Sequence, residues 1–173
     1  CFREYTAELL LRLGEGGIDV TPLRRLIEEN ISEEAIRTSP VELYTTTYSV
    51  DDRRELVIDL KQVEDGQIID YLLASAYIFP LFKSEKVQGK TCIDAGAFNN
   101  VPVDALLERG YKDIITIRIF GVGRTKRVYP DEDTNIFSIE PRVNLGNIID
   151  FDYRKSRRNL KIGYFDAKRF LYG

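Results

Sequence analysis

Hydrophobic residues recur at helical spacing in three segments near the start of the chain. Residues 1–13 carry an apolar stripe that ends before Gly14, which predicts an amphipathic helix. Thr21 and Pro22 then begin a second helix, with threonine expected as the N-cap and proline at the first helical position. Ser32 begins a third, short helix with glutamates in its first turn. These segments predict packing faces and no chemistry.

The pattern then changes to that of strands. Residues 41–50, rich in Thr and Tyr, and residues 55–60 flank the polar segment DDRR and predict a β-hairpin at the edge of a larger sheet. Apolar residues return to helical spacing over residues 66–77, which predicts a buried helix. Ser75 in this helix is better interpreted as a small packing residue than as a nucleophile, because an activated serine needs a sharp exposed turn.

The most informative change of pattern lies within residues 83–103. A short apolar strand ends on Asp94, and the chain then breaks into Ala95 and Gly96. In α/β proteins, chemistry gathers at the carboxyl ends of strands. A carboxylate at this position can cap the next helix or turn, hold a loop, or accept a proton, and aspartate is common in the first two roles.

A helix is expected soon after this turn. Asn99 and Asn100 precede Pro102, which opens the periodic segment VDALLERG. Asparagine side chains bond readily to nearby backbone groups, so we expect both to orient the turn. The helix is predicted over residues 102–109, where Gly110 ends it.

Together with its neighbours, this helix predicts a right-handed βαβ unit with parallel strands over residues 90–94 and 114–120. The next segment contains the glycine pair Gly121 and Gly123. It lacks the third glycine and the following helix of a dinucleotide site, so we expect a loop and no cofactor. A last short strand is predicted over residues 136–141.

From about Asn147 onward the pattern predicts a terminal helix, interrupted near Gly163. Basic residues cluster before and within this region, and such clusters can bind anionic lipid headgroups or RNA phosphates. A solvated face balanced by nearby acids is the more common explanation and is favoured here. The two clusters are Arg124, Lys126 and Arg127, and Arg154, Lys155, Arg157 and Arg158.

Composition narrows the function classes. The 173 residues are 43% hydrophobic and 31% charged, which suits one soluble domain. A formal charge of −3 gives no overall attraction to nucleic acid. No apolar run approaches the roughly 20 residues needed to span a bilayer, and the first residues lack a signal-peptide pattern. We therefore expect a cytoplasmic protein that does not bind nucleic acid.

Three residue types constrain the chemistry. Cys1 and Cys92 are the only cysteines, which predicts neither a disulfide framework nor a metal cluster and suits a reducing compartment. The absence of histidine excludes a Ser-His-Asp triad, a Cys-His pair and a histidine metal site carried by this chain alone. A base must then be a carboxylate or a lysine. The absence of methionine suggests a piece of a longer chain.

The segment DAGAFNNVPV (residues 94–103) resembles the second signature of the patatin-like phospholipase family, Asp-Gly-Gly or Asp-Gly-Ala followed by Asn and Pro on the way into a helix. Residues 71–82 are similar to the family's helix that ends at a proline before this strand, and residues 110–119 resemble its next strand. The resemblance runs from roughly Val20 to the C-terminus. Ala95 departs from the usual glycine, which would cost about 1 kcal/mol if the position needs a left-handed backbone.

The resemblance implies a three-layer α/β fold with a mainly parallel sheet, of which residues 1–173 would be the C-terminal part of one domain. It also implies a serine acyl hydrolase that uses a Ser-Asp dyad on a lipid or other ester. Asp94 would be the base, and burial beside Ile93 and Phe98 would raise its affinity for protons. Contact with a membrane surface and the oligomeric state stay open. Supporting positions in the turn would be Ala95, Gly96, Asn99, Asn100 and Pro102.

The nucleophile of such a dyad is absent from this sequence. None of the seven serines has glycine at both −2 and +2, so there is no G-x-S-x-G elbow, and no glycine-rich oxyanion loop occurs. In the family both lie N-terminal to the matched region, so we expect the chain alone to be inactive on esters. The serines are Ser32, Ser39, Ser49, Ser75, Ser84, Ser138 and Ser156.

Two other classes remain open. A family member that has lost catalysis and binds lipid or a protein partner would explain Ala95. A plain α/β interaction module, in which Asp94 only caps a turn, would lose stability but no activity on Asp94→Asn substitution.

Overall fold

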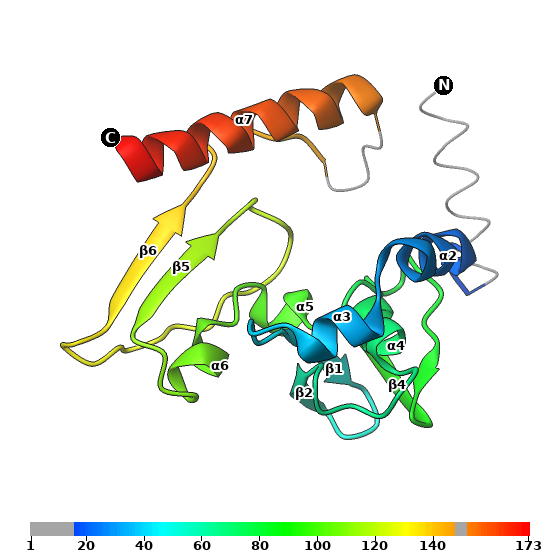
Figure 1. The fold of residues 1–173 in the computed structure, drawn as a ribbon. Coiled ribbons are helices and arrows are strands. Elements are labelled where there is room, and N and C mark those ends of the chain that lie inside the picture. Colours follow the sequence, from blue (N-terminus) through cyan, green and yellow to red (C-terminus); the bar gives the residue numbers. More distant parts are fainter. Residues whose placement is uncertain (1–15, 148–151) are drawn as a thin grey trace. The chain divides into compact units, whose positions relative to one another are not determined.

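A computed structural model describes residues 16–147 and 152–173 (Figure 1). The helix predicted over residues 1–13 lies outside these residues. The chain divides into two compact units, an N-terminal unit, Cys1–Ala95, and a C-terminal unit, Gly96–Gly173. The boundary falls directly after Asp94 and Ala95. The prediction that residues 1–173 belong to one domain stays a prediction.

Three described helices belong to the N-terminal unit. Helix α2 (Thr21–Asn30) has proline in its first turn as predicted, but its N-cap is Val20 and not Thr21. The reason is that the side chain of Asp19 accepts a hydrogen bond from the Thr21 amide at 3.0 Å, so the helix starts one residue earlier. Helix α3 (Glu33–Thr38) is capped by the Ser32 hydroxyl, as predicted.

The sheet of this unit has four strands in the order β2-β1-β4-β3, and each neighbouring pair is antiparallel. The predicted hairpin of β1 and β2 is confirmed. We expected both of its strands near the edge of the sheet, and β2 is an edge strand, whereas β1 lies inside the sheet between β2 and β4. The strands are β1 (Tyr44–Ser49), β2 (Arg54–Asp59), β3 (Lys86–Val87) and β4 (Lys90–Asp94).

The parallel βαβ unit predicted around Asp94 is wrong, because both edges of β4 are occupied by antiparallel neighbours. On one side lies β1, and on the other lies β3, joined to β4 by a two-residue turn. The turn residues Gln88 and Gly89 both have left-handed backbones, with φ of 49° and 77°. Such a turn matches the twist of an antiparallel hairpin. On this side β3 pairs with Lys90 and Thr91, and the Asp94 amide bonds to the Tyr77 carbonyl, so the edge is not paired with the strand that follows in the chain.

Helix α4 (Ile68–Ala74) supplies much of the core of the N-terminal unit, which confirms the predicted buried helix. At the start of this unit, the backbone of Gly17 lies so close to that of Lys83 that an added Cβ would be 2.6 Å from the Lys83 amide nitrogen. Hydrogen bonds from Ile18 to Leu81 and from Lys83 to Ile18 hold the two segments together. The buried core comprises Val20, Leu60, Ile68, Tyr71, Leu73, Ala74, Tyr77, Val87 and Cys92.

The C-terminal unit contains a two-stranded parallel sheet (Figure 1). Its strands are joined across the sheet by the hydroxyls of Thr116 and Ser138, whose oxygens lie 2.8 Å apart. The long helix α7 packs on β6 through an edge-to-face contact between Phe137 and Phe170 at 6.1 Å. The elements are α5 (Gly96–Asn99), α6 (Val103–Leu107), β5 (Asp113–Ile117), β6 (Asn135–Ile139) and α7 (Tyr153–Tyr172).

Two further predictions need correction, one about helix α7 and one about the fold as a whole. Helix α7 runs continuously through Gly163, so the predicted interruption is wrong. Glycine lowers helix propensity by about 1 kcal/mol, which the 20-residue helix tolerates because no proline accompanies it. The fold is mixed α/β as expected, but a mainly parallel sheet is wrong, since the only parallel pairing among the described strands is between β5 and β6.

Candidate functional site

Asp94 is the last residue of β4, as the sequence predicted. Its amide donates a hydrogen bond to the Tyr77 carbonyl at 3.0 Å, and it lies opposite Thr47 on β1. The side chain is half-buried. The carboxylate is therefore carried by a strand end whose backbone is held from two directions.

Thr47 and Tyr77 are the positioning residues that sequence analysis missed. The Thr47 hydroxyl, fully buried, donates to the Ile93 carbonyl at 2.8 Å and also lies 3.3 Å from the Ala74 carbonyl. It thereby links β1, the end of β4 and the end of α4. A buried threonine within a Thr-rich strand carries no sequence signal that separates it from its half-buried neighbours.

Tyr77 is 1% exposed, and its hydroxyl donates to Glu85 Oε2 at 3.3 Å. Burial, with the nearby carboxylate of Glu85, raises the pKa of Tyr77 to about 12. The phenol is neutral at physiological pH, so Tyr77 acts on Asp94 through its backbone carbonyl. This role follows from the chain path between α4 and β4, which the sequence pattern does not reveal.

Ala95 is fully buried and has an ordinary backbone. The described non-glycine residues with left-handed backbones are Arg53, Gln88 and Phe120, and Ala95 is not among them. The alanine in place of the family's usual glycine therefore carries no left-handed strain. Ala95 therefore gives no reason to expect a displaced Asp94 carboxylate.

Phe98, which was expected to shield Asp94, keeps 42% of its surface exposed. Ile93, the other expected apolar neighbour, is half-buried in β4. A raised affinity of Asp94 for protons stays a prediction.

The remaining motif residues open the C-terminal unit. Gly96 begins α5, and Asn99, 1% exposed, ends it. The Asn99 side chain donates to Asp104 Oδ1 at 2.8 Å and accepts from the Lys126 amide at 3.5 Å. Pro102 is the N-cap of α6, where its carbonyl accepts a hydrogen bond from Ala105.

Asn100 binds the same distant loop. Its amide donates to the Arg124 carbonyl at 2.6 Å, and its side chain donates to the Gly121 carbonyl at 3.3 Å. Both asparagine side chains bond to backbone groups, although these lie outside the nearby backbone of the turn that the sequence led us to expect. Their backbone partners lie in residues 121–126, more than twenty positions away, and this loop is the part of the arrangement that sequence analysis did not anticipate.

Gly123 explains why the loop can approach α5 so closely. Its φ is +151°, and a Cβ at this position would lie 2.0 Å from the Gly96 carbonyl oxygen. The Arg124 amide donates to that same oxygen at 3.3 Å. The glycine pair interpreted as a loop is a loop, and its second glycine is required by close backbone contact.

Asp104 completes this contact with an ion pair to Lys126, whose Nζ lies 2.9 Å from Oδ2. Burial raises the pKa of Asp104, but hydrogen bonds from Lys126 and Asn99 lower it more, so the pKa lies below its usual value. The carboxylate stays ionised near neutral pH. Asp104 therefore fixes the loop and is poorly suited to accept a proton in a reaction.

The other side chains that could carry chemistry, Ser75 and Cys92, lie in positions that suit structural roles. The Ser75 hydroxyl donates to the Leu72 carbonyl at 2.7 Å at the end of α4, which agrees with a packing role. Burial raises the pKa of the Cys92 thiol, which is 2% exposed in β4 and therefore stays protonated. In the described part of the chain, no three His, Cys, Asp or Glu side chains are grouped to hold a metal ion.

Among the described residues, no helix is both long enough and apolar enough to cross a membrane.

The boundary between the two units falls within the motif. Asp94 and Ala95 are the last residues of the N-terminal unit, whereas Gly96, Asn99, Asn100 and Pro102 lie in the C-terminal unit. The structure thus divides the motif into a carboxylate-bearing strand end and a separately anchored turn.

In a comparison with protein families, the model described as patatin-like phospholipase matches residues 3–107. The matched segment contains Asp94, the turn and α6, which confirms the resemblance inferred from the motif. It begins before Val20 and ends at Leu107, so β5, β6 and α7 lie outside it. Comparison with curated protein sequences gives no match.

Proposed function

The chain belongs to the patatin-like phospholipase family, a family of lipid acyl hydrolases, and from this membership we propose that it contributes the base of a Ser-Asp dyad. The observation that carries the proposal is the position of Asp94 at the carboxyl end of β4 inside the matched segment. The serine would come from outside these 173 residues, because none of their serines lies in a G-x-S-x-G elbow.

The surroundings of Asp94 support this role. A general base needs a fixed position within hydrogen-bond reach of the proton that it accepts. The bonds made by the Tyr77 carbonyl and the Thr47 hydroxyl hold the last two residues of β4, which limits movement of the carboxylate. In addition, a base supplied by these 173 residues must be a carboxylate or a lysine, because they contain no histidine.

The proposed reaction is acyl transfer to water. Asp94 accepts the proton of the serine hydroxyl as its oxygen attacks the ester carbonyl, and backbone amides stabilise the resulting oxyanion. The carboxylic acid then protonates the leaving alcohol, which leaves an acyl-enzyme. Water, deprotonated by the same carboxylate, attacks the acyl group and releases the fatty acid and the free serine.

The test uses the protein from the complete reading frame that includes these residues, treated with a fluorophosphonate probe that labels activated serines. We expect labelling of the unsubstituted protein and a roughly 100-fold to 10,000-fold slower reaction after Asp94→Asn substitution, the usual range for loss of a general base. Asp65→Asn is the matched control, because the Asp65 side chain is 99% exposed. Equal labelling of all three proteins would refute the role of Asp94.

The isolated 173-residue chain gives a second measurement. We expect no turnover of a soluble ester above that of its Asp94→Asn variant, because the chain has no serine elbow. Turnover above this control would show that a serine within the chain serves as the nucleophile.

The alternative function is a family member that has lost catalysis and binds lipid or a protein partner. The observation that favours it is Ala95, at the position where the family usually has glycine. The ordinary backbone and full burial of Ala95 weaken this argument, since alanine is accommodated there. Absence of labelling in the complete protein, with its fold intact, would favour the alternative.

A further inference from the structure

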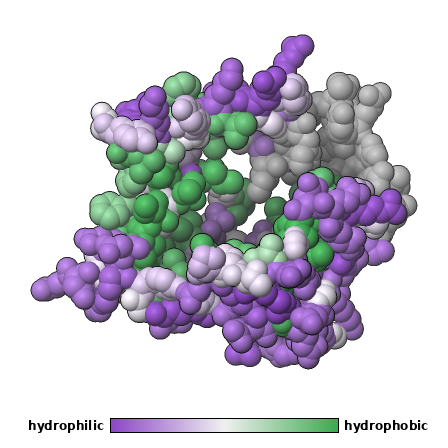
Figure 2. Space-filling view, viewed as in Figure 1, coloured by the Kyte–Doolittle hydropathy of each residue, from purple (hydrophilic) through white to green (hydrophobic). Residues whose placement is uncertain are grey.

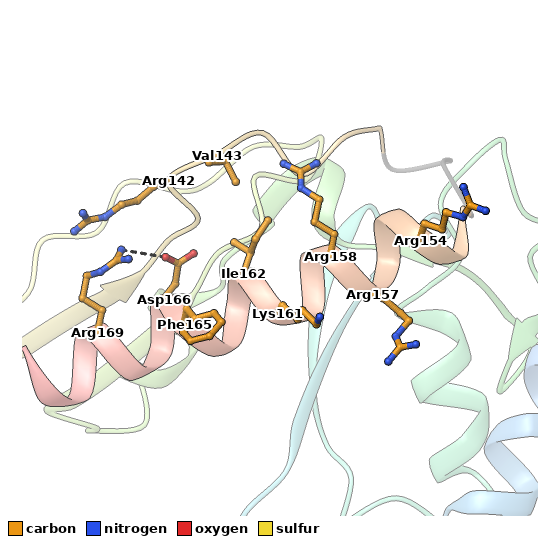
Figure 3. Close-up of a pocket in the computed structure, with 10 residues that line it drawn as sticks. All are labelled: Arg142, Val143, Arg154, Arg157, Arg158, Lys161, Ile162, Phe165, Asp166 and Arg169. Atoms are coloured by element: carbon orange, nitrogen blue, oxygen red, sulfur yellow. Dashed lines mark hydrogen bonds and ion pairs between the residues drawn. The ribbon is translucent and has the colours of Figure 1, made fainter.

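The C-terminal unit carries a basic groove between α7 and the segment around Arg142 (Figure 3). It has a volume of about 720 Å³, and a single carboxylate, Asp166, lies among its lining residues. The apolar side chains of Val143, Ile162 and Phe165 also line it. The cationic residues that line the groove are Arg142, Arg154, Arg157, Arg158, Lys161 and Arg169.

Most of these cations lack an acidic partner among the described residues. Arg169 pairs with Asp166 at 3.3 Å, and Arg157 contacts the ring and hydroxyl of Tyr153. The structure shows no described carboxylate within ion-pair distance of Arg142, Arg154, Arg158 or Lys161. Figure 3 shows Arg158 pointing from α7 toward the segment that carries Val143. In a chain with a net charge of −3, such a concentration of unpaired positive charge favours an anionic ligand.

An apolar cleft of about 960 Å³ adjoins the groove and shares Ile162 and Asp166 with it. Its lining includes the aliphatic side chains of Ile117, Ile119 and Ile139. Ile117 is 73% exposed and Ile119 is 69% exposed, so this apolar surface is open to a ligand. Figure 2 shows hydrophobic side chains, in green, gathered over this side of the β5–β6 pair.

Two buried oxygens at the cleft have no hydrogen-bond partner among the described residues. They are Oδ2 of Asp166, whose side chain is 10% exposed, and Oδ1 of Asn159. Both residues line the cleft, and Asp166 also lines the groove. Buried polar atoms in folded proteins are nearly always satisfied, so these oxygens call for a ligand that donates hydrogen bonds. Hydroxyl groups next to a phosphate would supply such donors.

We propose that the C-terminal unit binds an anionic phospholipid with a hydroxyl-bearing headgroup, at the groove formed by α7 and the Arg142 segment. Arg142, Arg154 and Arg158, which are spread along the groove, attract phosphates of the anionic surface. Asp166 and Asn159 accept hydrogen bonds from headgroup hydroxyls, and the first carbons of an acyl chain enter the cleft. The binding docks the protein on an anionic membrane surface. It does not depend on catalysis by Asp94.

RNA is the other polyanion that a basic groove could bind, and the surroundings favour lipid. Proteins that bind single-stranded nucleic acid use exposed aromatic rings on which bases stack. Exposed rings lie here too, Phe165 in the groove and Phe120 in the cleft. The cleft adds the exposed aliphatic side chains of Ile117 and Ile119, which suit an acyl chain and offer a base no ring to stack on. Phosphate contacts alone would not explain an adjoining apolar surface.

The experiment measures partition of the 173-residue Asp94→Asn protein, which cannot consume lipid through that carboxylate, onto vesicles. Vesicles of phosphatidylcholine alone are compared with vesicles that contain phosphatidylglycerol or, at the same fraction, phosphatidylmethanol. We expect binding to phosphatidylglycerol vesicles, weaker binding to phosphatidylmethanol vesicles, which carry the same charge but no hydrogen-bond donor in the headgroup, and none to phosphatidylcholine. Binding should decrease as salt is added, because salt screens the attraction.

The test variant carries Arg142→Gln, Arg154→Gln and Arg158→Gln, all at exposed positions. Each basic residue near an anionic surface contributes about fivefold, so partition should fall about 100-fold. The control variant carries Arg25→Gln, Lys83→Gln and Lys86→Gln, which remove the same charge from exposed positions of the N-terminal unit. It should retain most of the binding. Circular dichroism establishes that both variants are folded.

Four results would overturn the proposal. The first is equal loss of binding in both triple variants, which would show attraction by net charge alone. The second is equal binding to phosphatidylglycerol and phosphatidylmethanol, which would remove the role of Asp166 and Asn159 as acceptors. The third is displacement from vesicles by inorganic phosphate at matched ionic strength, which would indicate a site for phosphate and not for lipid. The fourth is tighter binding to an RNA oligonucleotide than to any vesicle.

Discussion

Replacing Gly123 with alanine should detach the loop of residues 121–126 from α5. The added Cβ would lie 2.0 Å from the Gly96 carbonyl oxygen, whereas ordinary contacts begin near 3.4 Å, so the two segments must separate by about 1.4 Å (3.4 minus 2.0). Separation on this scale breaks the hydrogen bond between the Arg124 amide and Gly96. It also strains the bond between the Asn100 amide and Arg124.

The expected cost combines two contributions. A non-glycine residue at a φ of +151° is strained by about 1–3 kcal/mol. Loss of one or two hydrogen bonds adds about 0.5–1.5 kcal/mol each. The variant should therefore lose about 2–5 kcal/mol of unfolding free energy, a large share of the 5–15 kcal/mol typical of a domain.

Urea denaturation followed by circular dichroism measures the loss, and hydrogen exchange at the amides of Asn100 and Arg124 locates it. Gly121→Ala is the matched control two residues away, where the nearest atom to an added Cβ is the flexible end of the Asn100 side chain at 3.4 Å. It should cost less than about 1 kcal/mol, the range of surface substitutions that can be accommodated. The reasoning is refuted if Gly123→Ala is as stable as Gly121→Ala and protects both amides equally well.

Three further predictions concern other parts of the chain. Gly163→Ala in α7 should raise stability by about 0.5–1 kcal/mol, because no atom lies within 4 Å of the added Cβ; a lower thermal midpoint would contradict this. Because the fold lowers the pKa of Asp104 below its usual 3.8, its stabilising contribution is present above that value and is lost as pH falls through the lowered pKa. Acid should therefore reduce the unfolding free energy less in Asp104→Asn than in the unsubstituted protein, and identical pH profiles would exclude this role. In a Cys1→Ser protein, Cys92 should react with Ellman's reagent slowly when native and rapidly in denaturant, because burial raises its pKa and blocks access; fast native reaction would contradict the buried placement.

The local elements were predictable because each depends on neighbours in sequence. Ser32 caps α3, the polar segment between β1 and β2 forms a hairpin turn, and the apolar stripe of residues 66–77 buries α4. The same local signals placed Asp94 at the end of a strand and identified the family to which the chain belongs. These signals operate over a few residues, so the sequence displays them directly.

Strand pairing was not predictable in the same way. The apolar run of β4 is compatible with parallel or antiparallel neighbours, and the choice depends on which strand edges are free. Gln88 and Gly89, which both have left-handed backbones, form the turn of the β3–β4 hairpin. Strand β3 then pairs with β4 on the side where a parallel neighbour would lie. Glycine at the second turn position was visible in the sequence, but the left-handed glutamine before it was not.

By itself, the sequence determined that these 173 residues supply no histidine, which carboxylate ends the motif strand, and where most helices and strands form. The tertiary structure alone decided that Thr47 and Tyr77 hold the end of β4, that residues 121–126 anchor Asn99 and Asn100, and that the basic residues of α7 line a groove. The physical reason is distance along the chain. Capping, periodicity and turn preference act between near neighbours, whereas buried hydrogen bonds and clustered charges join residues that only the folded backbone brings together.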